Sequence, residues 1–183
     1  FYNRDKFELL NYQRINLSDH FKSDHLFEQT KDTQERLNIR NTVALIAVLK
    51  HKVTNETIFL SNIHLYWSPK HDDVKFMQTY LMTKLLQQTI LRHYKATADD
   101  HLSGLLMKHK PKIVMVGDFN SEPNSMVYEF LSTGKLDTGK EKRWVHDYGE
   151  GFTKGNIILN PLGCFKSPYK ELFDKKLFTK TTY

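Results

Sequence analysis

The feature that most constrains this chain is a short apolar strand that ends in a carboxylate and a carboxamide. Residues 112–118 read Lys-Ile-Val-Met-Val-Gly-Asp, and Phe-Asn follows directly. Such an unbroken apolar run is typical of a strand that is covered on both faces. If residues 118–120 stay extended, Asp118 and Asn120 point to the same side of the sheet. Pro-Asn-Ser then opens a helix that we predict for residues 123–131.

Two further patterns precede this strand. Residues 41–67 form two β-rich runs around a polar turn at 53–56, which predicts an antiparallel hairpin. Alternation along the second run places four side chains on one face: Ile58, Leu60, Asn62 and His64. Residues 72–85 begin with two aspartates and continue with apolar side chains three and four positions apart, which predicts a helix. The order β-β-α-β-α predicts an α/β (α+β) fold with helices packed on a mixed sheet.

The rest of the chain gives weaker signals. Residues 17–40 are polar and are expected to form an irregular insertion. Beyond Gly134 the sequence favours loops, with regular structure expected only near residues 170–173. No apolar run approaches the roughly 20 residues of a membrane-spanning helix, so no such segment is expected. The single cysteine, Cys164, excludes an internal disulfide framework and suits a reducing compartment.

The charge of the chain allows polyanionic partners without requiring them. The 27 Lys and Arg residues against 21 Asp and Glu residues give a formal charge of +6. A basic surface favours nucleic acids through counterion release, but solvated basic faces are also common on other proteins.

Three side chains at expected strand ends are candidates for chemistry: His64, Asp118 and Asn120. A carboxylate can hold Mg²⁺ or orient an attacking water. An amide and an imidazole can donate to phosphoryl oxygens as charge develops there. Gly-Asp-Phe-Asn is also ordinary turn chemistry, and a single strand histidine is often structural. Spacing alone leaves metal-assisted phosphoester hydrolysis as one reading among several.

Two long motifs narrow these readings. SNIHLYWSPKHDDVKFMQTYLMTKLL (61–86) and VMVGDFNSEPNSMVYEFLSTG (114–134) occur in this order. Together they closely resemble the endonuclease/exonuclease/phosphatase superfamily in its deadenylase-like branch, with the fungal Ngl-type RNA exonucleases as the nearest group. The resemblance spans most of residues 1–134. It implies a DNase I-like four-layer sandwich of two mixed sheets flanked by helices.

The resemblance implies a role for each matching residue of the site. His64 would hydrogen-bond the scissile phosphate, and Asn120 would hold a phosphoryl oxygen. Asp118 would position the attacking water and bind Mg²⁺, with Mn²⁺ as an alternative, directly or through water. The main metal-binding glutamate of the family has no counterpart in this chain. Two Ser-Asp-His triplets, at 18–20 and 23–25, lie on the wrong side of both motifs and are not expected to replace the family's C-terminal one.

Three further residues are expected to contact the substrate. Pro69 occupies a position that lies beside the terminal base in the resembling deadenylases. Trp67 and Tyr66 are candidates for stacking on single-stranded bases. In some deadenylases a second histidine stands where this chain has Tyr66, which argues against strict poly(A) specificity.

The expected function is that of a Mg²⁺-dependent 3′-5′ RNA exonuclease that releases 5′-mononucleotides from single-stranded RNA, in rRNA 3′-end processing or in poly(A) and mRNA decay. Two alternatives stay open: another phosphoesterase of the superfamily, acting on nucleotides or DNA, and a non-catalytic RNA-binding member. Residues 1–183 are expected to form one partial domain that is inactive alone. The expected location is intracellular, in the cytoplasm or nucleus, with the mitochondrion as a further option. Protein partners are not predicted.

Overall fold

The computed structural model describes residues 2–96 and 101–169 of the 183-residue chain. Its elements follow in this order: β1 (Phe7–Asn16), α1 (Leu17–Ser23), η1 (Thr33–Leu37), β2 (Val43–His51), β3 (Thr57–His64), α2 (Asp72–His93), α3 (Leu102–His109), β4 (Lys112–Asp118), α4 (Met126–Thr133), β5 (Lys135–Asp137), η2 (Glu150–Phe152) and β6 (Ile157–Leu159). The expected structure near residues 170–173 lies outside the described residues.

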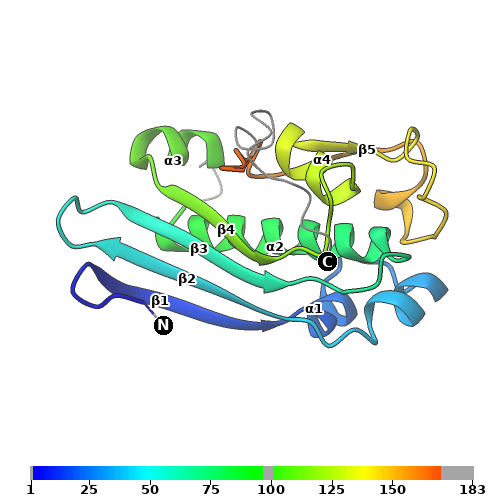
Figure 1. The fold of residues 1–183 in the computed structure, drawn as a ribbon, viewed down its shortest axis with the longest axis horizontal. Helices are drawn as coiled ribbons and strands as arrows, with labels where there is room; N and C mark the ends of the chain where they lie inside the picture. Colours follow the sequence, from blue (N-terminus) through cyan, green and yellow to red (C-terminus); the bar gives the residue numbers. More distant parts are fainter. Residues whose placement is uncertain (1, 97–100, 170–183) are drawn as a thin grey trace.

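The main sheet has the strand order β1-β2-β3-β4. The pairs β1–β2 and β2–β3 are antiparallel, which confirms the predicted hairpin, and β3–β4 is parallel. Strands β5 and β6 form a second, two-stranded sheet. A mixed sheet with helices, plus a second sheet, confirms the predicted α/β class (Figure 1).

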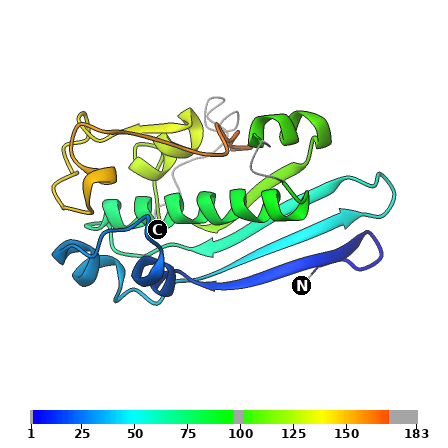
Figure 2. The same cartoon turned by 180° about the vertical axis from the view of Figure 1, so that it is seen from behind.

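Helix α2 covers one face of the main sheet along its length (Figure 2). Its apolar side chains recur at the predicted spacing, and Phe76, Met77 and Leu81 are fully buried. Ile46 and Phe59 from the sheet belong to the same hydrophobic cluster. Burying such a side chain contributes about 1.5–3 kcal/mol, so the contact between α2 and the sheet contributes strongly to the stability of the core. None of the described helices is both long and apolar enough to span a membrane.

The opposite face of the main sheet carries no helix among the described residues. Val43 and Leu45 of β2 are 49% and 40% exposed, and Val114 and Val116 of β4 are 37% and 40% exposed. We refer to these four side chains as the open apolar face. The expectation that β4 is covered on both faces is therefore wrong for the described chain. Among the described residues β4 is an edge strand that pairs with β3 alone, and an apolar run does not distinguish an edge from an interior position.

The polar stretch 17–40 is not irregular. It contains helix α1 and a π-helical turn, η1, and it buries four apolar side chains in the main core: Leu17, Phe21, Phe27 and Leu37. Asn16 caps α1 by accepting from the backbone N–H of Ser18. Leu17 and Phe21 are four residues apart, as on one helix face, but α1 has only seven residues and is too short for a helical period to stand out among its polar neighbours. Both Ser-Asp-His triplets lie in this region.

Helix α4 confirms the helix predicted for residues 123–131, but it begins at Met126 and ends at Thr133. The Ser125 hydroxyl accepts from the backbone N–H of Tyr128, and Gly134 closes the helix with φ +77°. Helix α3 and the short strands β5 and β6 were not predicted, because each is brief and is held mainly by tertiary contacts.

Gly117 in β4 makes the closest backbone approach in the sheet. Its φ is +129°, and a Cβ placed there would lie 1.8 Å from the carbonyl oxygen of Ile63. We expect Gly117→Ala to lower the free energy of unfolding by about 2–4 kcal/mol, because backbone strain and overpacking each cost about 1–3 kcal/mol. Urea titration of the full-length protein measures this.

The matched control is Gly104→Ala in α3, where an added Cβ meets nothing within 4 Å. That change is expected to raise the stability by about 0.5–1 kcal/mol, through helix propensity and a less flexible unfolded chain. Equal effects of the two substitutions would contradict the assignment of strain to Gly117.

Candidate active site

The register of the parallel β3–β4 pair brings two predicted residues together. His64 and Asp118 are Cα partners at the carboxyl ends of their strands. Their side chains are 71% and 63% exposed, and His64 Nε2 lies 3.8 Å from Asp118 Oδ2. This separation is too long for a hydrogen bond. Both groups therefore stand side by side and remain available to a ligand.

The backbone turns sharply after Asp118. Asn120 has φ +45°, so residues 118–120 are not extended as the alternation argument assumed. Asp118 Oδ1 accepts from the backbone N–H of Asn120 at 2.9 Å, which is the local turn bond that aspartate favours. The turn does not exclude a functional role, because Asp118 uses one oxygen for the turn and directs the other toward His64.

The side chain of Asn120 joins this turn to the end of β3. Its Nδ2 donates to the carbonyl oxygen of Leu65 at 2.8 Å, and the Leu65 N–H donates to the carbonyl oxygen of Asp118. The bond to Leu65 uses one of the two amide hydrogens. Asn120 is therefore brought to the site, with its side chain directed at the backbone that follows His64.

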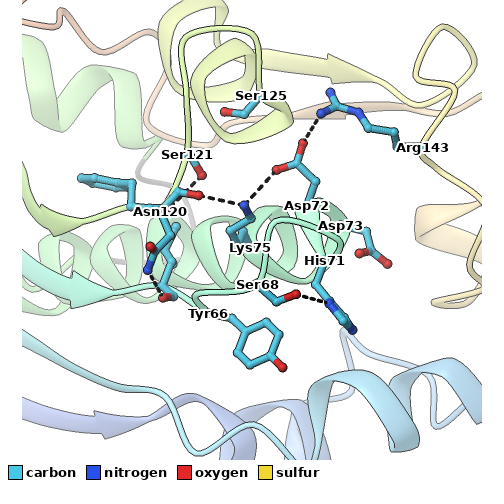
Figure 3. Close-up of polar contacts among 12 residues, drawn as sticks. Tyr66, Ser68, His71, Asp72, Asp73, Lys75, Asn120, Ser121, Ser125 and Arg143 are labelled. Atoms are coloured by element: carbon cyan, nitrogen blue, oxygen red, sulfur yellow. Dashed lines mark hydrogen bonds and ion pairs between the residues drawn. The ribbon is translucent and has the colours of Figure 1, made fainter. Parts of the chain in front are cut away.

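A buried cation lies directly beneath the turn. Lys75 in the first turn of α2 is 3% exposed, and its Nζ donates to the carbonyl oxygen of Asn120 at 2.7 Å (Figure 3). The same Nζ lies 3.4 Å from Asp72 Oδ1, and Arg143 pairs with the other Asp72 oxygen. Sequence reasoning missed Lys75 as part of the site. The available signal was a lysine placed three residues after an aspartate on an otherwise apolar helix face.

A second buried ion pair adjoins the first. Asp73 is 3% exposed and accepts three charged hydrogen bonds from the Nη2 and Nε atoms of Arg36, and one from the Tyr148 hydroxyl. Burial, and then the negative charge of Asp73, raise the pKa of Tyr148, so the phenol stays protonated and donates. The start of α2 is thus fixed from both sides, by residues of the 17–40 region and by residues beyond 140.

The predicted substrate-contacting residues flank the site unequally. Trp67 is 68% exposed and Pro69 is also exposed. Tyr66 is half-buried, because its ring packs under the Arg40 guanidinium at 4.4 Å and edge-on against His71. Burial, followed by the charges of Arg36 and Arg40, lowers the pKa of His71, which keeps that imidazole neutral near pH 7. Of the two aromatic residues expected to contact the substrate, Trp67 is the one whose ring is mostly exposed.

Asp118 has a carboxylate oxygen that could bind a divalent cation. Within the parts of the chain that are described, no group of three His, Cys, Asp or Glu residues is arranged to hold a metal ion. Asp118 offers one exposed carboxylate oxygen, the ligand type that Mg²⁺ prefers. Magnesium sites are often built from one or two carboxylates plus waters and substrate phosphates. Asp118 fits as one such ligand.

Sequence comparison finds relatives that are named as Ccr4 exoribonuclease subunits. The chain is 32% identical over 149 residues to the CCR4-Not complex 3′-5′-exoribonuclease subunit Ccr4 of Kluyveromyces lactis, and 32% identical over 150 residues to that of Candida albicans. These matches cover 81% and 82% of this chain but only 18% of each relative. The chain therefore spans under a fifth of the length of these curated relatives. No family model matches the chain.

Structure comparison finds more distant similarity. The human Nocturnin catalytic domain with bound sulfate is 20% identical, with 70% of this chain and 36% of that chain covered and a TM-score of 0.46. ANGEL2, described as a 2′,3′-cyclic phosphatase in complex with adenosine-2′,3′-vanadate, is 25% identical, with 76% and 33% covered and a TM-score of 0.49.

Proposed function

Since the chain belongs to the deadenylase-like branch of the endonuclease/exonuclease/phosphatase superfamily, we propose that it forms part of the active site of a metal-dependent 3′-5′ exoribonuclease. The substrate would be single-stranded RNA and the products 5′-mononucleotides. The juxtaposition of His64 and Asp118 at the ends of two parallel strands carries this proposal. The intracellular location and the domain limits stay predictions.

Each residue of the site has a distinct proposed role. Asp118 Oδ2, which the turn leaves free, orients the water that attacks phosphorus in line with the leaving oxygen. His64 Nε2 donates to a non-bridging phosphoryl oxygen, where negative charge grows in the transition state. Asn120 has an amide hydrogen beyond the one bonded to Leu65 for a second phosphoryl oxygen. Phosphodiester hydrolysis depends on such alignment and charge stabilisation more than on covalent catalysis.

Asp118 is the described residue that would bind the divalent cation, Mg²⁺ or Mn²⁺. When bound, the cation supplies charge neutralisation at phosphate and raises the acidity of nearby water. Among residues 2–96 and 101–169 no group of three His, Cys, Asp or Glu residues could hold the ion, so further ligands would have to come from outside these residues. The segment alone is therefore expected to be inactive.

The exposed aromatic side chain gives the RNA base a place to stack. Trp67 follows His64 by three residues and presents a free ring surface. Base–aromatic stacking is worth about 1–3 kcal/mol per base and tolerates any base. Pro69 would border the same base, whereas Tyr66, packed against Arg40, would support Trp67 at a ring-centroid distance of 5.9 Å.

A single set of reactions tests the proposal. The full-length protein is incubated with 5′-labelled single-stranded RNAs, one ending in adenosines and one of mixed sequence, with Mg²⁺ or with EDTA. We expect a ladder that shortens from the 3′ end with Mg²⁺ and is absent with EDTA. Comparison of the two RNAs measures poly(A) preference. Activity on single-stranded DNA or on nucleotide phosphates alone would move the assignment to another phosphoesterase, and binding without cleavage would indicate a non-catalytic member.

Replacing Trp67 separates stacking from chemistry. Trp67→Ala is expected to raise KM for RNA by about 5- to 150-fold, the equivalent of about 1–3 kcal/mol, with kcat nearly unchanged. Steady-state kinetics on the mixed-sequence RNA measure both constants. Val145→Ala, at an exposed apolar position outside the site, is the control. An unchanged KM in Trp67→Ala would remove Trp67 from the substrate contacts.

A further inference from the structure

We propose that Lys75 is a positioning residue for the Asp118–Asn120 turn and links its geometry to the segment Glu141–Arg143. The inference rests on the proposed function for its catalytic consequence, but its structural content can be measured without any substrate. Lys75 does not face the His64–Asp118 pair itself. It acts through the carbonyl oxygen of Asn120.

The turn needs an external support. Asn120 is held at φ +45°, a conformation that non-glycine residues adopt at a cost. The N–H of Asn120 is bonded within the turn to Asp118 Oδ1, and Ser121 Oγ donates to the carbonyl oxygen of Phe119. The carbonyl oxygen of Asn120 points away from both and meets the ammonium of Lys75 at 2.7 Å. This charge-assisted bond is the contact between the turn and helix α2 that fixes the turn's height above the helix.

Burial makes the contact specific. The Lys75 side chain is 4% exposed and that of Asp72 is 9% exposed, so the ammonium has little access to water. A buried ammonium persists only when it is paired and hydrogen-bonded. Asp72 supplies the charge and Asn120 supplies the acceptor, which leaves Lys75 few alternative positions.

The pairing continues outward to a distant segment. Arg143 Nη1 pairs with the second oxygen of Asp72, and Arg143 Nη2 pairs with Glu141 at 2.8 Å. Two cations and two carboxylates therefore alternate from the turn to the surface. Arg143 is half-exposed. An RNA phosphate can therefore contact Arg143, and dissolved salt can screen its charge. We infer that the Glu141–Arg143 segment influences the turn through Asp72 and Lys75.

The test replaces Lys75 with Met, which keeps the length of the side chain and removes its charge. In the full-length protein, amide hydrogen exchange of a peptide covering residues 117–122 is expected to accelerate at least about tenfold, whereas a peptide from β2 exchanges as before. With RNA, kcat is expected to fall about 10- to 100-fold with KM changed less than about twofold, because the reacting groups lose alignment. Lys84 lies on the same helix and is half-exposed, so Lys84→Met is the matched control. It is expected to change neither the exchange rate nor kcat.

A second variant separates positioning from charge balance. Lys75→Met alone leaves the buried Asp72 carboxylate with Arg143 as its cation and is expected to lower the thermal midpoint. In Asp72→Asn/Lys75→Met residue 72 is neutral, so the thermal midpoint is expected to recover toward wild type. The fast exchange and low kcat are expected to persist. If the thermal midpoint, the exchange rate and kcat all recovered in the double variant, the inference would be overturned. An unaltered exchange rate in Lys75→Met would overturn it as well. If the wild-type protein does not cleave RNA, the exchange measurement still decides the role of Lys75 while the proposed function fails separately.

Discussion

Replacing Asp118 with Asn is expected to reduce RNA cleavage by the full-length protein about 10²- to 10⁴-fold, the range for loss of a group that acts on a reacting atom. The amide oxygen of the new residue can still accept from the Asn120 N–H, so the turn is retained. What is lost is the negative charge beside His64, to which we assign the roles of orienting water and binding the cation. Single-turnover cleavage of 5′-labelled RNA at saturating Mg²⁺ measures the effect.

The control for this substitution is Asp19→Asn. Asp19 is exposed and belongs to a Ser-Asp-His triplet in α1 that has no place in the site. Its replacement is expected to leave the cleavage rate within about twofold of wild type. A small effect at Asp118, or a comparable loss at Asp19, would show that the chemistry is carried elsewhere. Circular dichroism of both variants establishes that the fold is intact.

The largest effect on stability is expected at Arg36. Arg36→Met leaves the Asp73 carboxylate, 4% exposed, without its cation and with the Tyr148 hydroxyl as its remaining strong donor. Removing one partner of a buried pair costs about 3–5 kcal/mol, because the other charge stays buried. Total stabilities are about 5–15 kcal/mol, so this is a large fraction. Urea unfolding of the full-length protein, followed by fluorescence of the buried Trp144, which packs against Tyr148, measures the loss.

An exposed ion pair provides the comparison. Lys31 and Glu35 are 85% and 63% exposed, with 4.0 Å between Nζ and Oε1. Lys31→Met is expected to change the free energy of unfolding by no more than about 1 kcal/mol. If Arg36→Met proved as mild as Lys31→Met, the 17–40 region would not fix the start of α2.

The elements whose signals are local were predictable from the sequence. The alternation in β3, the three- and four-residue spacing in α2 and the Ser125 cap of α4 each reflect contacts that a short window contains. The closeness of His64 and Asp118 was also predictable, because both residues end strands and the carboxyl ends of parallel strands share one edge of a sheet.

Features that depend on distant partners were not predictable. Lys75 joins the site because the first turn of α2 lies under a turn 45 residues later in the chain. Leu17 and Phe21 belong to the main core because α1 follows β1 directly and packs there, although their sequence neighbours are polar. Whether Asn120 would be extended or turned was not predictable, because its local bond to Asp118 competes with strand geometry and no sequence pattern shows which of the two prevails.

The pairing of β3 with β4 also determines which changes in chain length the molecule can accept. Each strand alternates its side chains between the α2 side and the open apolar face, and His64 and Asp118 lie opposite each other at the last step of the ladder. One residue inserted within β4 would turn Asp118 to the other face and move it out of line with His64. The turn between β2 and β3 lies at the other end of the sheet (Figure 1), where added residues disturb neither side chain. Natural length variation in this family is therefore expected to collect at that turn and to be absent from β4.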